Sequence, residues 1–97
     1  MREGIVSAPA GPIAVEFFGT ARARAGRADL CAVGRTVADI LGDVMAQCPG
    51  LAGLLTEDGR LSRRYLVSFD GERFADDSDE PVPAGCRLLI LGADAGG

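Results

Sequence analysis

Residues 36–48 read TVADILGDVMAQC, and this stretch decides the fold because it carries the clearest helical pattern in the chain. Its hydrophobic residues recur about every 3.6 positions, which places them on one face of a helix. These residues are Val37, Ile40, Leu41, Val44, Met45 and Cys48. Thr36 and Asp39 have the spacing of a capping box, in which each side chain bonds the backbone N–H of the other residue. Because Pro49 and Gly50 end the pattern, we predict one main helix whose apolar face covers a core.

Short apolar runs on both sides of this helix predict β-strands, because they are rich in β-branched and aromatic residues. The predicted strands are residues 13–18, 28–33, 65–69, 72–74 and 86–91. Asp70 and Gly71 join the third strand to the fourth, and both residue types tolerate the positive φ of a tight hairpin turn. The consecutive apolar residues 88–91 are typical of a central strand that is covered on both faces. Residues 20–27 alternate small residues with Arg and predict a surface loop or a weak turn.

The order of these elements predicts an α+β fold of the β-grasp type. Two predicted strands precede the helix and three follow it, so the helix crosses one face of a mixed sheet of four to five strands. The first and last strands are then expected side by side and parallel at the centre of the sheet. We assign residues 13–91 to this domain, residues 1–12 to a flexible leader and residues 92–97 to a flexible tail of small residues.

The composition excludes several classes of function. The chain has 97 residues, enough for one domain. Its net charge of −4 and the absence of a basic cluster argue against nucleic-acid binding. No apolar run approaches the roughly 20 residues of a membrane helix. Because there is no His, neither a Ser-His-Asp triad nor a Cys–His pair can form, and three Cys are too few for a zinc site. We interpret Cys31, Cys48 and Cys86 as small core residues of a protein from a reducing compartment, the cytoplasm.

Five short segments carry a resemblance to a known family. They are residues 15–22 (VEFFGTAR), 36–41 (TVADIL), 69–72 (FDGE), 82–88 (VPAGCRL) and 93–97 (ADAGG). In this order and spacing they resemble the MoaD/ThiS sulfur carriers, which are ubiquitin-like β-grasp proteins. That family includes the small subunit of molybdopterin synthase and the carrier of the thiamine pathway. The resemblance covers residues 13–97, nearly the whole chain.

The resemblance implies chemistry at the end of the main chain and not at side chains. In this family a ubiquitin-activating-type adenylyltransferase uses ATP and Mg²⁺ to adenylate the terminal carboxylate, which is that of Gly97 here. A sulfur donor, either a sulfurtransferase or a source of sulfide, then converts the end to a thiocarboxylate. The thiocarboxylate passes its sulfur to a sulfur-accepting synthase. The chain itself is expected to bind no cofactor and no metal. It acts as a protein co-substrate and not as an enzyme, unless it is the small subunit of a sulfurtransferase such as molybdopterin synthase.

The resemblance also implies a set of partner-binding residues. They are Phe18, Arg22, Ala93, Asp94, Ala95 and Gly96. Small residues let the tail thread a narrow tunnel, and the two final glycines let a partner's backbone and a nucleotide phosphate approach the last carbonyl closely. The region from Phe18 to Arg22 is expected near the surface that docks the activating enzyme and the sulfur-accepting partner.

Two other functions fit the same residues. One is a protein modifier whose Gly97 forms an isopeptide bond with a target lysine, and the other is a β-grasp binding module with an idle tail. The pathway of a carrier is also open. Carriers of the molybdopterin type have two prolines before their last residues, whereas residues 91–94 here are Leu, Gly, Ala and Asp. Carriers for thiamine, cysteine or specialised sulfur metabolites are therefore alternatives.

Overall fold

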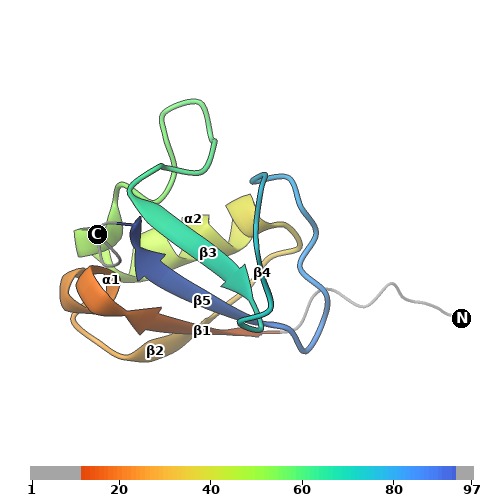
Figure 1. Ribbon diagram of the computed structural model, residues 1–97, viewed down its shortest axis with the longest axis horizontal. Coiled ribbons are helices and arrows are strands. Elements are labelled where there is room, and N and C mark those ends of the chain that lie inside the picture. Colours follow the sequence, from red (N-terminus) through yellow and green to blue (C-terminus); the bar gives the residue numbers. More distant parts are fainter. Residues whose placement is uncertain (1–11, 94–97) are drawn as a thin grey trace, which may run out of the picture.

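The computed structural model describes residues 12–93, which form one sheet with a helix across one of its faces (Figure 1). The elements are β1 (Ile13–Phe18), α1 (Gly19–Ala25), β2 (Asp29–Ala32), α2 (Val37–Gln47), the short 3₁₀ helix η2 (Pro49–Leu51), β3 (Tyr65–Phe69), β4 (Arg73–Phe74) and β5 (Arg87–Gly92). The sheet has five strands in the order β2-β1-β5-β3-β4. β1 and β5 are parallel, and the other neighbouring strands are antiparallel. The predicted α+β fold of the β-grasp type is confirmed, and the strand ends differ from the prediction by at most one residue.

Helix α2 forms as its sequence pattern predicts. The Asp39 N–H donates to Thr36 Oγ1 at 3.2 Å, and the Thr36 N–H donates to Asp39 Oδ2 at 3.3 Å, which completes the capping box. The predicted stripe faces the sheet, and its fully buried members are Val37, Ile40, Leu41, Val44 and Cys48. Burial of each such side chain contributes roughly 1.5–3 kcal/mol, so this stripe holds the helix on the sheet.

The core lies between α2 and the inner face of the sheet. From the two central strands it takes Ile13, Val15, Phe17, Leu88 and Ile90, none of which is more than 1% exposed. The prediction that the last strand is covered on both faces is wrong. Leu89 and Leu91 point to the outer face and are only half-buried, since no helix of residues 12–93 lies over that face (Figure 1).

The surface loop predicted over residues 20–27 is a helix instead. Ala and Arg are strong helix formers, but Ala21 is the one buried residue of α1, so no apolar stripe indicates the helix in the sequence. The helix ends at Gly26, whose N–H donates to the Arg22 carbonyl at 3.0 Å. Gly19 has a φ of +58°, which lets the chain turn directly from β1 into α1 and which other residues rarely adopt.

The hairpin between β3 and β4 is the predicted one. Asp70 and Gly71 have φ values of +57° and +76°, as a tight turn of this kind requires. The Asp70 carboxylate also accepts a hydrogen bond from the Arg87 N–H at 2.9 Å. The turn is thereby tied to the start of β5.

The acidic loop that follows β4 covers the first turn of α2. The carbonyls of Glu80 and Ser78 accept hydrogen bonds from the N–H groups of Val37 and Ala38, both at 2.9 Å. Such donors have no partner within the helix itself. The Glu80 carboxylate forms an ion pair with Arg73 at 2.9 Å. The loop therefore closes the end of the molecule at which β5 begins.

Candidate functional site

The end of β5 fixes the point from which the predicted tail continues. Gly92 is the last residue of β5 and pairs with Tyr65 of β3. The next residue, Ala93, is exposed, and its N–H donates to the Arg64 carbonyl at 2.8 Å. The other predicted tail residues, Asp94, Ala95, Gly96 and Gly97, lie outside the described residues. The central strand thus holds Ala93 in a defined place at one end of the sheet.

Close to this end, the outer face of the sheet carries large apolar side chains. The register aligns Phe18, Leu91 and Leu66 in one row across β1, β5 and β3. Phe18 is 40% exposed and Leu66 is 39% exposed. Leu89 follows on the same face of β5, because residues two apart in a strand share a face. We call Phe18, Leu66, Leu89 and Leu91 the open-face patch. Grouped apolar surface of this kind is typical of protein-interaction sites.

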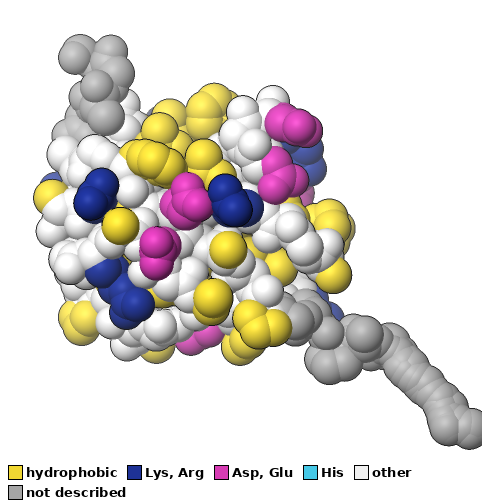
Figure 2. All heavy atoms as spheres, turned by 90° about the horizontal axis from the view of Figure 1, so that it is seen from below, with side chains coloured by type: hydrophobic (Ala, Val, Ile, Leu, Met, Phe, Trp, Pro, Cys, Tyr) yellow, Lys and Arg dark blue, Asp and Glu magenta, His cyan; other side chains and the backbone are white. Residues whose placement is uncertain are grey.

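A charged pair borders the open-face patch. Arg87 Nη1 lies 3.2 Å from Glu16 Oε2 on the same outer face, and Glu16 is aligned with Leu89. Figure 2 shows hydrophobic side chains gathered on one part of the surface with acidic and basic side chains next to them. An apolar centre with a polar border is the usual anatomy of a protein–protein interface.

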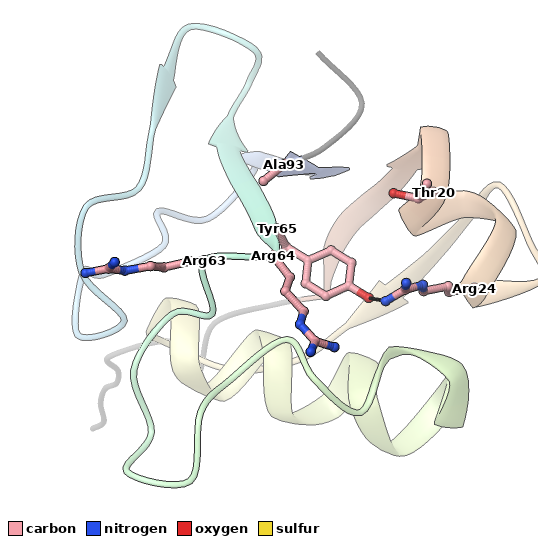
Figure 3. A pocket seen from close by; sticks show the side chains of 6 residues that line it. All are labelled: Thr20, Arg24, Arg63, Arg64, Tyr65 and Ala93. Carbon is pink, nitrogen blue, oxygen red and sulfur yellow. Dashed lines mark hydrogen bonds between the residues drawn. The ribbon is translucent and has the colours of Figure 1, made fainter. Parts of the chain in front are cut away.

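A pocket of about 420 Å³ lies at the same end of the sheet as Ala93. It is lined by Thr20, Arg24, Arg63, Arg64, Tyr65 and Ala93 (Figure 3), and we call it the arginine pocket. Arg24 Nη1 donates to the Tyr65 hydroxyl at 2.9 Å, and its guanidinium lies 5.9 Å from the centre of the Tyr65 ring. Figure 3 shows Arg64 directed toward the phenol end of Tyr65, whereas Arg63 points away from it. Because Tyr65 is only 6% exposed, it holds Arg24 from a fixed position.

The sequence did not single out most of these residues. Arg22, the docking residue that the resemblance suggested, is exposed on α1 but does not line the arginine pocket. Thr20 and Arg24 do line it, because residues four apart lie on one side of a helix. Arg64 and Tyr65 reach the pocket through the pairing of β3 with β5. The signals in the sequence were the closely spaced arginines at 22, 24 and 27 and the adjacent pair at 63 and 64.

The cysteines are only partly as predicted. Cys48 and Cys86 are buried, but Cys31 is exposed, because its position in β2 directs it away from the core. The interpretation of Cys31 as a core residue is therefore wrong. Burial raises the pKa of the Cys86 thiol, and the neighbouring Asp70 carboxylate raises it further. This thiol is consequently protonated at neutral pH and a poor nucleophile.

The described side chains offer features suited to recognition. Within residues 12–93, no three His, Cys, Asp or Glu side chains are grouped so that they could hold a metal ion. Across the same range, no helix is both long enough and apolar enough to cross a membrane. What the described part of the chain presents is an apolar patch, a cationic pocket and the end of the central strand.

The fold and this surface define a ubiquitin-like β-grasp protein. No family model matches the chain, and no curated protein matches it in sequence. Solved structures match it over most of its length. The crystal structure of SAMP1 from Haloferax volcanii has a TM-score of 0.75 and 25% identity, covering 90% of this chain and 100% of that chain. A chain of the BexX/CysO complex from Amycolatopsis orientalis has a TM-score of 0.71 and 27% identity, covering 88% of this chain and 99% of its own.

A third match is the solution structure of the HVO 2177 protein from Haloferax volcanii, with a TM-score of 0.70 and 28% identity, covering 90% of this chain and 89% of that chain. SAMP1 is a small archaeal modifier protein, and CysO is a sulfur carrier of the ThiS/MoaD type. The resemblance to MoaD/ThiS-type proteins is therefore confirmed. Of these proteins, SAMP1 and CysO are ubiquitin-like carriers or modifiers.

Proposed function

We propose that this protein is a sulfur carrier whose terminal glycine, Gly97, is adenylated and converted to a thiocarboxylate. The observation that carries the proposal is the position of Ala93, which the central strand β5 holds beside the open-face patch and the arginine pocket. A partner that docks on this patch is well placed to receive the residues that follow Ala93. The similarity to CysO, which spans 99% of the matched chain, supports the same function.

The proposed chemistry takes place in the active sites of partners. The Gly97 carboxylate attacks the α-phosphorus of ATP in a ubiquitin-activating-type adenylyltransferase, and pyrophosphate leaves. This step converts a poor electrophile into an acyl-adenylate. A hydrosulfide equivalent from a sulfur donor then attacks the acyl carbon, AMP leaves, and a thiocarboxylate remains. The thiocarboxylate is ionised at neutral pH and passes its sulfur to a substrate in a sulfur-accepting synthase. The activating enzyme binds and uses ATP and Mg²⁺. This chain contributes the reacting carboxylate and the docking surface.

A second candidate function is that of a protein modifier. The similarity to the small archaeal modifier protein SAMP1, which covers 90% of this chain, favours it. Both functions begin with adenylation of the same carboxylate and differ in the group that attacks the acyl carbon. In a modifier this group is the amine of a target lysine, which gives an isopeptide bond.

Intact-protein mass spectrometry separates the two functions. The full chain is incubated with ATP, Mg²⁺ and a ubiquitin-activating-type enzyme from the same genome, in one arm with sulfide and in the other with a cell extract that supplies target proteins. A carrier gains the mass that corresponds to exchange of one oxygen for one sulfur. A modifier instead gives adducts with target proteins. If neither product forms with any such enzyme of that genome, both functions are rejected and a binding module is left.

Deletion of Gly97 tests which residue reacts. We expect the deletion to abolish sulfur incorporation, because the reacting carboxylate is then one residue short of the partner's active site. The melting temperature should change by no more than about 1 °C, since the core lies within residues 13–90. Full sulfur incorporation by the shortened chain would contradict the proposed role of Gly97.

A further inference from the structure

The arginine pocket concentrates positive charge on a chain that is acidic as a whole. The chain carries 14 Asp and Glu against 10 bases. None of the residues that line the pocket is acidic, and three of them are Arg24, Arg63 and Arg64. Within residues 12–93, no carboxylate forms an ion pair with any of these three arginines. Their charges are thus left for a group outside the described part of the chain.

Arg24 is oriented and does not simply extend into solvent. Its Nη1 donates to the Tyr65 hydroxyl at 2.9 Å, and its guanidinium lies 5.9 Å from the ring centre. The backbone of Arg24 in α1 also packs closely against η2, because a Cβ added at Gly50 would collide with the Arg24 carbonyl oxygen. This contact fixes the backbone from which the Arg24 side chain extends. A guanidinium that is held in place loses less side-chain entropy when it binds an anion.

We propose that Arg24 and Arg64 form a docking pocket for carboxylates of the activating enzyme, which rests on the function proposed above. The pocket and the open-face patch lie at the same end of the sheet, since Thr20 follows Phe18 by two residues and Tyr65 precedes Leu66. An enzyme seated on the patch therefore has its own acidic side chains within reach of the pocket. Guanidinium groups bind carboxylates through paired N–H donors, which adds direction as well as attraction.

The lining favours a carboxylate over a nucleotide. A nucleobase needs an exposed aromatic or apolar face on which to stack. The one aromatic lining residue, Tyr65, is 6% exposed. The remaining lining residues are three arginines, Thr20 and Ala93. The pocket therefore has the charge to bind an anion but no surface for a base.

Kinetics of adenylation test the pocket. The exchange of pyrophosphate into ATP is measured with the activating enzyme and the full chain, and KM is determined separately for the chain and for ATP. In R24A/R64A we expect KM for the chain to rise about 10-fold at low salt, with kcat and KM for ATP unchanged. The rise should shrink as salt increases, because salt screens exposed charges. The matched control, R27A/R35A, loses the same charge outside the pocket and should stay within about 2-fold of the wild type.

The other outcomes overturn the proposal. Equal rises in R24A/R64A and R27A/R35A would show an effect of net charge alone. A raised KM for ATP with an unchanged KM for the chain would place nucleotide phosphates in the pocket.

A second measurement needs no enzyme and tests directly whether the arginine pocket binds carboxylates. It still applies if the wild-type chain supports no pyrophosphate exchange, a result that would reject the proposed function itself. The ¹⁵N-labelled chain is titrated with a blocked Asp-Glu-Asp-Glu peptide and, at equal ionic strength, with inorganic phosphate. The amide signals of Arg64, Tyr65 and Ala93 should shift with the peptide and not with phosphate, and R24A/R64A should abolish the shift. Equal shifts with phosphate would indicate an adventitious ion only, and no shift would exclude the pocket.

Discussion

The two ends of the sheet differ in whether their charged side chains are paired within the chain. At the end where β5 begins, charged groups bond within the chain: Glu80 pairs with Arg73, and the Asp70 carboxylate binds the Arg87 N–H. At the end where β5 stops, Arg24 and Arg64 have no carboxylate partner within residues 12–93. Within residues 12–93, the chain itself pairs the charges at the first end and leaves Arg24 and Arg64 at the second end without a carboxylate.

Apolar groups follow this division only in part, because Val33 and Phe74 are exposed at the first end as well. At the first end, the loop after β4 covers the start of α2 and buries Ser78 and Val82. At the second end, the open-face patch leaves Phe18 and Leu66 more than one-third exposed. Figure 1 shows these regions at opposite ends of β5. If the comparison holds, substitutions at the first end change stability, and substitutions at the second end change partner use.

The largest effect is expected for Phe18→Ser at the second end. Loss of an aromatic side chain from the centre of an interface weakens binding strongly, so KM of the chain in adenylation should rise about 30-fold. Stability should hold, because Phe18 is the N-cap of α1 and makes no side-chain capping bond, whereas Ser is a favoured N-cap residue. The control is Val33→Ser, which alters an apolar residue that is 56% exposed outside the patch. Equal KM values for the two variants would contradict the assignment of partner binding to the open-face patch.

A smaller effect, on stability alone, is expected for Glu80→Ala at the first end. The change removes the ion pair with Arg73 and the acceptor for the N–H groups of Asp76 and Asp77. Thermal unfolding followed by circular dichroism should show a melting temperature lower by a few degrees. KM of the chain in adenylation should not change. A raised KM with an unchanged melting temperature would assign this end to partner binding.

Acid should lower the stability of the folded protein, because the hydrogen-bonded carboxylates at the first end become protonated. The Asp76 N–H is the main cause that lowers the pKa of Glu80, and the Arg35 N–H is the main cause that lowers the pKa of Asp39. A carboxylate whose pKa is lower in the folded state adds stability above its unfolded pKa, and this stability is lost as pH falls through the folded pKa. Chemical denaturation below pH 4.5, the ordinary pKa of Glu80, should show this loss. The double variant D39N/E80Q should lose less stability over the same range, and an unchanged slope would contradict the assignment.

The smallest effect is expected for Tyr65→Phe. The ring keeps its place in the core, but Arg24 loses the hydroxyl that orients it. KM of the chain in adenylation should rise about 2- to 3-fold, less than in R24A/R64A, because the guanidinium itself is retained. The same substitution in the R24A background should add nothing. An additive effect there would mean that the Tyr65 hydroxyl acts independently of Arg24.

The elements with a repeating pattern could be predicted from the sequence, and the site could not. Helix α2 and the turn at Asp70 and Gly71 follow from local rules of spacing, capping and φ. Helix α1 was missed because Ala21 is its one buried residue. The contact between Arg24 and Tyr65 joins positions 41 apart, so it exists only once β3 and β5 have paired. The open-face patch likewise depends on the register of three strands.

The central pairing of β1 with β5 also sets when the protein can fold. Val15 lies beside Leu88, so the strands that form the middle of the sheet come from nearly opposite ends of the chain. Pairings so distant in sequence form late and slowly. β5 is the last strand along the chain, so Leu88 and Ile90 become available only after every other strand of the sheet has been made. Packing of the interior therefore waits for β5, and Val15 and Phe17 lack their partners from that strand until then.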